Sequence, residues 1–343
     1  MIETSSNFGG IPMKRNLFLS ALAFGLCMCA VSAVPNTASA AENEYTIAGV
    51  GKDRTPWFIR HSAGVMEGAK ENGMKGIYSA APTADEAQQV RIIEDYIAKG
   101  VNALLVVPNN AKSLEPSFKK AREKGIAVVT QESPDQVNAD FDVEMLDNTK
   151  FGELMMDELN KYSKGKAGTY AIYVGSLTVP AHNKWADAAI NRQKEKYPQL
   201  KFINKYPVSE DRNASRQTAL DLLKTYPDLV GIICMGSEGA PGVAKALKEK
   251  KLKNKIVVLG VTTPNVGRKD IKAGYMTEGL LWDPAQAARV QAYIAKVILD
   301  GHRDDIKPGF EVPNFGKPEI KGNTLIFDQP LQVTIDNVDK LDF

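Results

Sequence analysis

Short apolar runs alternate with longer amphipathic segments through most of the chain. The runs are rich in Val, Ile and Ala, and their length is typical of buried strands. The predicted strands are Tyr45–Val50, Lys75–Ala80, Ala103–Val107, Ile126–Thr130, Phe141–Leu146, Thr169–Val174, Lys201–Tyr206, Val230–Met235, Ile256–Val261 and Met276–Leu281.

The segments between most of these runs have apolar residues at helical spacing. In residues 85–99, Val90, Ile93 and Ile97 share one face, and Thr83 with Glu86 forms the pattern of a capping box. The predicted helices are Asp85–Lys99, Thr149–Tyr162, Asn183–Tyr197, Ala214–Tyr226, Gly239–Lys250 and Pro284–Leu299.

Strands that alternate with helices at this rhythm predict right-handed βαβ units and parallel sheets. The number of strands favours two doubly wound sheets over one, and the pattern restarts at Thr169. Pro and Gly are frequent in residues 301–324, which predicts a loop, and Thr324–Ile335 reads as one further extended segment. No low-complexity linker separates the two halves, so we expect the chain to cross between lobes at strand ends.

The first 40 residues have the pattern of a secretory signal peptide. Lys14 and Arg15 precede the apolar stretch 17–34, and Ala38-Ser39-Ala40 is a small-x-small cleavage site. The alternative, a membrane anchor, is disfavoured because the stretch is short and Pro35 follows it. Met1 and Met13 both remain possible starts. Cleavage after Ala40 predicts an exported protein.

Composition and charge narrow the function classes. The chain has 343 residues, 43% of them hydrophobic, which excludes wholesale disorder. Its net charge is +2, and basic residues are interspersed with acidic ones, so nucleic acid is not expected as a partner. Cys27 and Cys29 leave with the signal peptide, so Cys234 alone cannot form an intramolecular disulfide.

Motifs for cofactor, metal or nucleophilic chemistry are lacking. Gly49-Val50-Gly51 follows a strand as a dinucleotide fingerprint would, but Arg54 stands where the third glycine is needed. No zinc, EF-hand or phosphate-loop pattern occurs. Ser-x-x-Lys occurs at both Ser117 and Ser163, which shows how little that pattern discriminates. We therefore expect no cofactor, no metal and no enzymatic activity.

Polar and aromatic residues follow the predicted strands at their carboxyl ends, where open α/β sheets bind ligands. Rings that stack on C–H faces, together with forked polar groups, suit a polyol. Taken singly, each residue has a structural alternative: Glu132 and Asp283 could cap helices, and Trp185 could be core. The predicted ligand-binding residues are Lys52, Trp57, Phe58, Asn109, Glu132, His182, Asn183, Ser237, Thr262, Trp282 and Asp283.

Several motifs, in their order along the chain, resemble one known family. The chain looks like a type I periplasmic substrate-binding protein of a sugar ABC transporter, in the ribose-binding-like group. The rhamnose-type and autoinducer-2-type members are the most similar, and the latter carry a lysine where Lys52 stands. The motifs that carry the resemblance are Pro56-Trp57-Phe58, Gln88-Gln89, Gly100-Val101-Asn102-Ala103, Lys124-Gly125-Ile126, Leu146-Asp147-Asn148, Val261-Thr262-Thr263-Pro264, Trp282-Asp283-Pro284 and Lys340-Leu341-Asp342-Phe343.

The resemblance implies a receptor in the periplasm that closes two lobes on a sugar or polyol and delivers it to an ABC permease. A chemoreceptor is a further partner that it implies. Lobe one would comprise residues 41–146 and about 281–310, and lobe two 147–280 and about 311–343. The crossings would lie near Leu146, Leu281 and Phe310.

Other functions on the same fold remain open. Autoinducer-2 is the alternative ligand, although those receptors have Asp-Gln where Ala181-His182 stand here. A sugar-responsive repressor would need a helix-turn-helix before the first strand, where this chain has the signal pattern. A hydrolase or isomerase would have to use Glu132 and Asp283.

Overall fold

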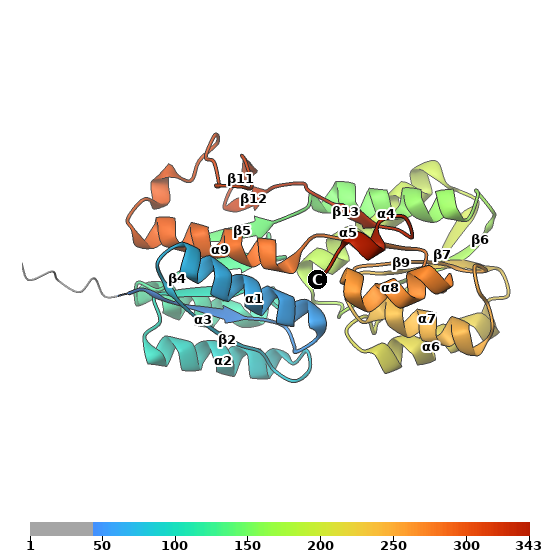
Figure 1. Cartoon of the computed structure of the whole chain (residues 1–343), viewed down its shortest axis with the longest axis horizontal. Helices are drawn as coiled ribbons and strands as arrows, with labels where there is room; N and C mark the ends of the chain where they lie inside the picture. The colour runs from blue at the N-terminus through green and yellow to red at the C-terminus, as the bar shows by residue number, and fades with distance from the viewer. Residues whose placement is uncertain (1–43) are drawn as a thin grey trace, which may run out of the picture. The chain divides into compact units, whose positions relative to one another are not determined.

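The computed structural model describes residues 44–343, and the predicted signal peptide lies outside this part. The described residues form two α/β lobes, each built around one sheet (Figure 1). The strand order is β11-β12-β5-β4-β3-β1-β2 in the first sheet and β13-β10-β9-β8-β6-β7 in the second. This confirms the predicted α/β class with two doubly wound, mainly parallel sheets.

The first sheet contains β1 (Thr46–Val50), β2 (Lys75–Ser79), β3 (Ala103–Val106), β4 (Ala127–Gln131), β5 (Phe141–Glu144), β11 (Glu319–Lys321) and β12 (Thr324–Ile326). The second contains β6 (Gly168–Val174), β7 (Leu200–Pro207), β8 (Leu229–Cys234), β9 (Val257–Gly260), β10 (Glu278–Leu281) and β13 (Leu331–Val333). The central strands β3 and β8 are buried along their whole length, as their unbroken apolar sequences predict.

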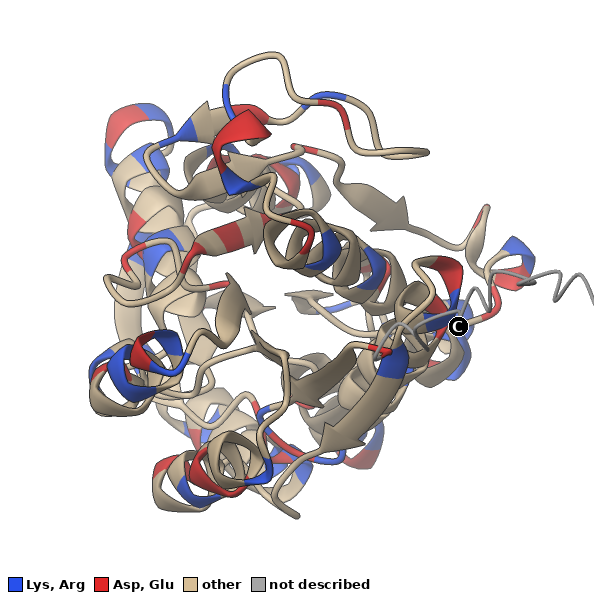
Figure 2. Cartoon of the chain, turned by 90° about the vertical axis from the view of Figure 1, so that its left-hand side faces the viewer, with Lys and Arg blue, Asp and Glu red and all other residues tan. Residues whose placement is uncertain are grey.

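The helices that pack on the first sheet are α1 (Pro56–Glu71), α2 (Glu86–Lys99), α3 (Ala111–Glu123) and α9 (Pro284–Leu299). Those of the second lobe are α4 (Asn148–Tyr162), α5 (Pro180–Lys196), α6 (Arg212–Thr225), α7 (Gly239–Glu249) and α8 (Pro264–Ala273). Basic and acidic residues are interspersed along the outer helices in the view of Figure 2.

Short polar side chains and prolines set where the helices begin. The carboxylates of Asp147, Asp211 and Asp283 accept backbone N–H bonds at the first turns of α4, α6 and α9. The predicted capping box at Thr83 is wrong, because α2 begins at Glu86 and Asp85 is its cap. The Asp85 carboxylate accepts a bond from the Gln88 N–H at 2.9 Å.

The chain crosses between the sheets after β5, after β10 and again after β12. The first two crossings lie where the sequence predicts them, near Leu146 and Leu281. The third lies between Ile326 and Leu331 rather than near Phe310. Residues 319–326 therefore extend the first sheet, which corrects the prediction that residues after about 310 belong to lobe two.

The predicted single extended segment 324–335 is in fact two strands in different sheets. Thr324–Ile326 pairs in parallel with β5, whereas Leu331–Val333 pairs antiparallel with β10. The physical reason is that β5 and β10 each leave a free edge at the end of a sheet. Pairing in the first sheet and then in the second satisfies the backbone groups of both edges.

Candidate functional site

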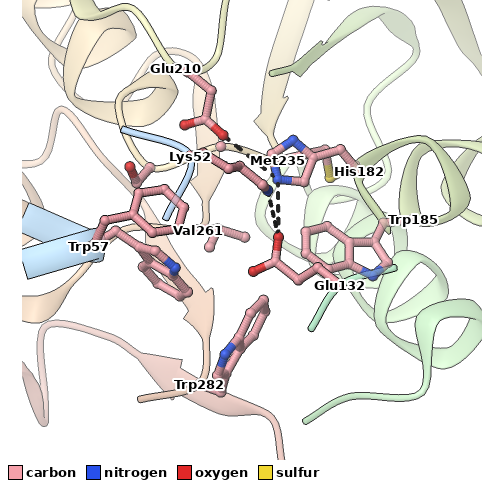
Figure 3. A pocket seen from close by; sticks show the side chains of 12 residues that line it. Lys52, Trp57, Glu132, His182, Trp185, Glu210, Met235, Val261 and Trp282 are labelled. Carbon is pink, nitrogen blue, oxygen red and sulfur yellow. Dashed lines mark hydrogen bonds and ion pairs between the residues drawn. The ribbon is translucent and has the colours of Figure 1, made fainter. Parts of the chain in front are cut away.

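A small cavity lies where strands of both sheets end at their carboxyl side. Lobe one contributes residues that follow β1 and β4, and lobe two contributes residues that follow β6, β7, β8, β9 and β10 (Figure 3). The lining residues are Lys52, Trp57, Phe58, Glu132, His182, Trp185, Glu210, Met235, Gly236, Ser237, Val261 and Trp282.

An ion pair within lobe one lies at the centre of the cavity. Lys52 Nζ donates to Glu132 Oε2 at 2.7 Å, and both side chains are almost fully buried. Burial opposes the charge on the lysine, but the nearby carboxylates of Glu132 and Glu210 outweigh it, so the pKa of Lys52 is raised. Lys52 is therefore a cation, with further N–H donors available to a ligand.

Glu132 is held in an uncommon backbone conformation. Its φ is 59°, in the left-handed region that residues other than glycine adopt rarely and at a cost of about 1–3 kcal/mol. This turn comes directly after β4 and directs the side chain to the Lys52 ammonium group. Such strain at a cavity wall is typical of a functional position.

His182 enters the cavity from the first turn of α5 as a neutral ring. Its Nδ1 accepts a bond from the Gly175 N–H at 3.1 Å, so the ring proton is on Nε2. Nε2 lies 3.9 Å from Glu132 Oε2 and 3.9 Å from Glu210 Oε1. Burial, and then the charge of Lys52, keep the pKa of His182 well below its usual value.

Glu210 is a cavity residue that the sequence analysis missed. It follows β7, so the same strand-end rule would have found it if applied to that strand. Burial raises the pKa of Glu210 to about 8, while Lys52 partly opposes the shift. Glycines make room for it: a Cβ at Gly175 or Gly236 would come within 2.9 Å of the Glu210 side chain.

All three tryptophans of the chain meet at the cavity wall. The ring centroids of Trp57 and Trp282 lie 5.0 Å apart in an edge-to-face arrangement, and those of Trp185 and Trp282 lie 5.7 Å apart. Trp185 also packs on Phe151 and donates its Nε1–H to Asn148. Trp185 thus has both the core role that the sequence suggests and a place in the wall.

The structure brings together Lys52, Trp57, Phe58, Glu132, His182, Ser237 and Trp282 of the predicted ligand-binding set. Two of their polar atoms, Ser237 Oγ and Trp282 Nε1, are buried without a hydrogen-bond partner in the described residues. Buried polar atoms are rarely left unpaired, so these two are available to a ligand or an ordered water.

The remaining predicted residues lie outside the lining. Asn109 supports it, since its Nδ2 donates to the Lys52 carbonyl at 3.3 Å. Asn183 donates instead to Ser176 and Val179 carbonyls. Thr262 is buried directly after Val261, and its Oγ1 is unpaired in the described part.

Asp283 has a structural environment of its own. It caps α9 by accepting from the Ala285 N–H at 2.9 Å. Its two oxygens also accept from Arg60 of α1 at 2.9 and 2.7 Å. A hydrolase would need Asp283 in the cavity with Glu132, and the lining does not include it.

Two further findings concern the described residues as a whole. Among residues 44–343, no three His, Cys, Asp or Glu side chains are grouped so that they could bind a metal ion. None of the helices in this range has the length and apolar content needed to span a bilayer.

Comparison with known proteins places the chain among solute receptors. The model of the periplasmic binding protein domain family matches residues 48–303. The D-allose-binding periplasmic protein of Escherichia coli is 27% identical over 281 residues, which cover 78% of this chain and 86% of the relative.

Solved structures share the fold. LsrB from Clostridium saccharobutylicum in complex with AI-2 has a TM-score of 0.80 at 23% identity, covering 87% of this chain and all of that one. A solute-binding protein from Clostridium phytofermentas with bound L-rhamnose has a TM-score of 0.81 at 22% identity, covering 87% of this chain and 98% of its own.

Proposed function

Since the chain belongs to the periplasmic binding protein family, we propose that it is an exported receptor that captures a small neutral sugar or polyol between its two lobes. The observation that carries this proposal is a cavity that is polar but carries no net charge near pH 7. Lys52 and Glu132 neutralise each other, His182 is neutral, and the pKa of about 8 keeps Glu210 mostly protonated.

The cavity walls match the chemistry of a polyhydroxyl ligand. Trp57 and Trp282 provide flat apolar surfaces, which pack against the C–H faces of a sugar. Lys52, Ser237 and the Trp282 N–H provide hydrogen bonds for hydroxyl groups. The D-allose-binding relative supports a monosaccharide as the ligand class.

Delivery and location follow from the same proposal. The predicted signal at residues 1–40 exports the protein to the periplasm, where the ligand-loaded form docks to an ABC permease. The ligand leaves chemically unchanged, since the receptor's task is capture and release. Incubation with the bound sugar, followed by mass spectrometry and NMR of the recovered ligand, tests this point.

A thermal-shift panel tests the ligand class. The panel contains D-allose, D-ribose, L-rhamnose, D-arabinose, xylitol and autoinducer-2. A sugar present at 100 times its dissociation constant should add about 2.7 kcal/mol to the free energy of unfolding. Glu132→Gln should weaken this stabilisation, whereas the control Glu123→Gln, an exposed carboxylate of the same lobe, should not.

The outcomes separate the possible ligands. Stabilisation by autoinducer-2 alone would favour the quorum-signal receptor, for which Lys52 is the supporting residue. If no sugar or polyol in a broader panel stabilises the parent protein, the proposed function is wrong.

A further inference from the structure

The strained turn at Glu132 is fixed from beneath by one buried carboxylate. Asp142 lies on β5, next to β4, and is fully buried. Its Oδ1 accepts a bond from the Thr130 hydroxyl at 2.7 Å and another from the Ser133 N–H at 3.1 Å. These donors flank Gln131 and Glu132, so Asp142 fixes the backbone on both sides of the turn.

This arrangement accounts for a conformation that the local sequence does not favour. A glutamate at φ 59° persists only when its surroundings over-determine it. Hydrogen bonds to a buried ionised acceptor are among the stronger ones in proteins. The two bonds to Asp142 stabilise the turn. The turn directs the Glu132 carboxylate to Lys52.

A second acid shares the environment of Asp142. Glu144, two residues further along β5, is also buried, and its Oε1 has no partner in the described part. Besides Glu144, the titratable group near Asp142 is Glu132. The neighbouring strands β4 and β12 place two threonines, Thr130 and Thr324, beside Asp142. Burial raises the pKa of Glu144 well above its usual value, so Asp142 holds the pair's negative charge.

We propose that Asp142 is a positioning residue for ligand binding: by bonding Thr130 and Ser133 it holds Glu132 in the conformation that pairs with Lys52 and contacts the ligand. The proposal rests on the proposed function, because Glu132 must bind the ligand for its position to matter. Burial raises the pKa of Asp142 to about 6, and the protonated acid keeps a carbonyl oxygen that can still accept both bonds.

Two substitutions separate positioning from general stability. Asp142→Asn keeps a carbonyl oxygen that can accept both bonds but does not titrate, whereas Asp142→Leu has similar volume and no acceptor. The control is Asp140→Asn. Asp140 is also buried on this side of lobe one, but it accepts from the Val128 N–H and pairs with Arg122 and Arg303, away from the turn.

The first readout needs no ligand. Amide exchange of Ser133 and the carboxyl 13C resonance of Glu132 are followed by NMR between pH 5 and 7.5. In the parent protein, Ser133 should stay protected across this range, because an acceptor oxygen remains in either protonation state of Asp142. Asp142→Leu should lower the Ser133 protection factor at pH 7 at least about tenfold, whereas Asp142→Asn should keep it at every pH.

The second readout is affinity for the panel sugar that stabilises the parent most. Asp142→Leu should weaken binding at least about tenfold, Asp142→Asn should bind nearly as well as the parent, and Asp140→Asn should bind normally even if less stable. Should Asp142→Leu not fold, Thr130→Val, which removes the hydroxyl donor to Asp142, should also weaken binding and decides in its place.

The results that overturn the proposal are specific. They are an unchanged Ser133 protection factor, or an unchanged Glu132 carboxyl resonance, in Asp142→Leu. If no sugar binds the parent, the proposed function fails separately, and the two NMR observations still decide the role of Asp142.

Discussion

Glu210 shows how burial of a single residue controls charge in the cavity. The folded protein keeps a proton on this carboxyl up to a pKa of about 8, whereas the unfolded chain releases it near 4.5. The free energy of unfolding therefore falls as pH rises through this window and levels off above it. The pKa of Glu278 is about 7 and that of Asp142 is about 6, so these two groups change the free energy of unfolding mainly at lower pH than Glu210 does.

Glu210→Gln should remove most of the stability change above pH 7. In the parent protein, the titration of Glu210 should lower the free energy of unfolding by about 1 kcal/mol between pH 7 and 8.5. The glutamine side chain has similar size and no charge, so the free energy of unfolding of the variant should fall by about 1 kcal/mol less over the same range. Urea unfolding at both pH values measures the difference, and equal slopes in the two proteins would contradict the assignment.

The three tryptophans should report ligand binding. Because Trp57, Trp185 and Trp282 all line the cavity, intrinsic fluorescence has no contribution from tryptophans elsewhere. Adding the ligand should change the emission in a saturable way. Loss of an aromatic surface in Trp57→Ala or Trp282→Ala should cost about 1–3 kcal/mol in binding, and the Phe variants should lose less.

Trp185 provides the comparison. Its N–H bond to Asn148 and its packing on Phe151 give it a larger structural role. Trp185→Phe should therefore lower the melting temperature clearly and change the affinity for the ligand little. Normal binding by both Trp57→Ala and Trp282→Ala would place the ligand elsewhere.

At the scale of elements, the junction between β10 and α9 depends on Asp283. The residue caps α9 and links it to α1 through Arg60, which is about one-third exposed. The sequence predicts a ligand contact here, and the structure provides a capping role that explains the same residue. The two roles make different predictions for one substitution.

Asp283→Ala should lower stability by about 1–2 kcal/mol through the lost cap, with little added from the partly exposed ion pair. If capping is its main role, affinity for the ligand should stay within about twofold of the parent. Thermal unfolding and calorimetric titration of the same sample measure both. Strong loss of affinity without loss of stability would restore Asp283 as a ligand residue.

At the scale of the whole described molecule, the lobes contact each other across the cavity as well as through the crossings. Thr178 of lobe two donates to Glu86 of lobe one at 3.0 Å, and Lys184 pairs with Asp135 at 3.0 Å. Both contacts involve exposed side chains, and exposed pairs contribute only about 0–1 kcal/mol. Closure of the lobes therefore depends mainly on the contacts that a ligand makes with both lobes in the cavity.

The ligand should accordingly shift a hinge equilibrium. Contacts to Lys52 and Glu132 on one lobe and His182 on the other favour the closed form, because only that form makes both sets at once. Small-angle scattering should give a smaller radius of gyration with saturating ligand than without. An identical radius in both states would mean that the lobes are rigidly joined.

The sequence by itself determined the elements, because their causes are local. Helical periodicity with Pro284 at the first turn predicts the last helix at 284–299, the bounds that the structure has. The strand-end rule predicts that Lys52, Trp57 and Glu132 lie together, because parallel strands end at one edge, and these residues share the cavity.

Only the tertiary structure decided which distant segments pair. Residues 324–335 read as one strand because β-propensity does not show which edge a strand will join, and the free edges of β5 and β10 divide it. Likewise, nothing near Asp142 in the sequence indicates that it bonds Thr130 and Ser133. That contact exists because β4 and β5 pair in one register, a consequence of non-local packing.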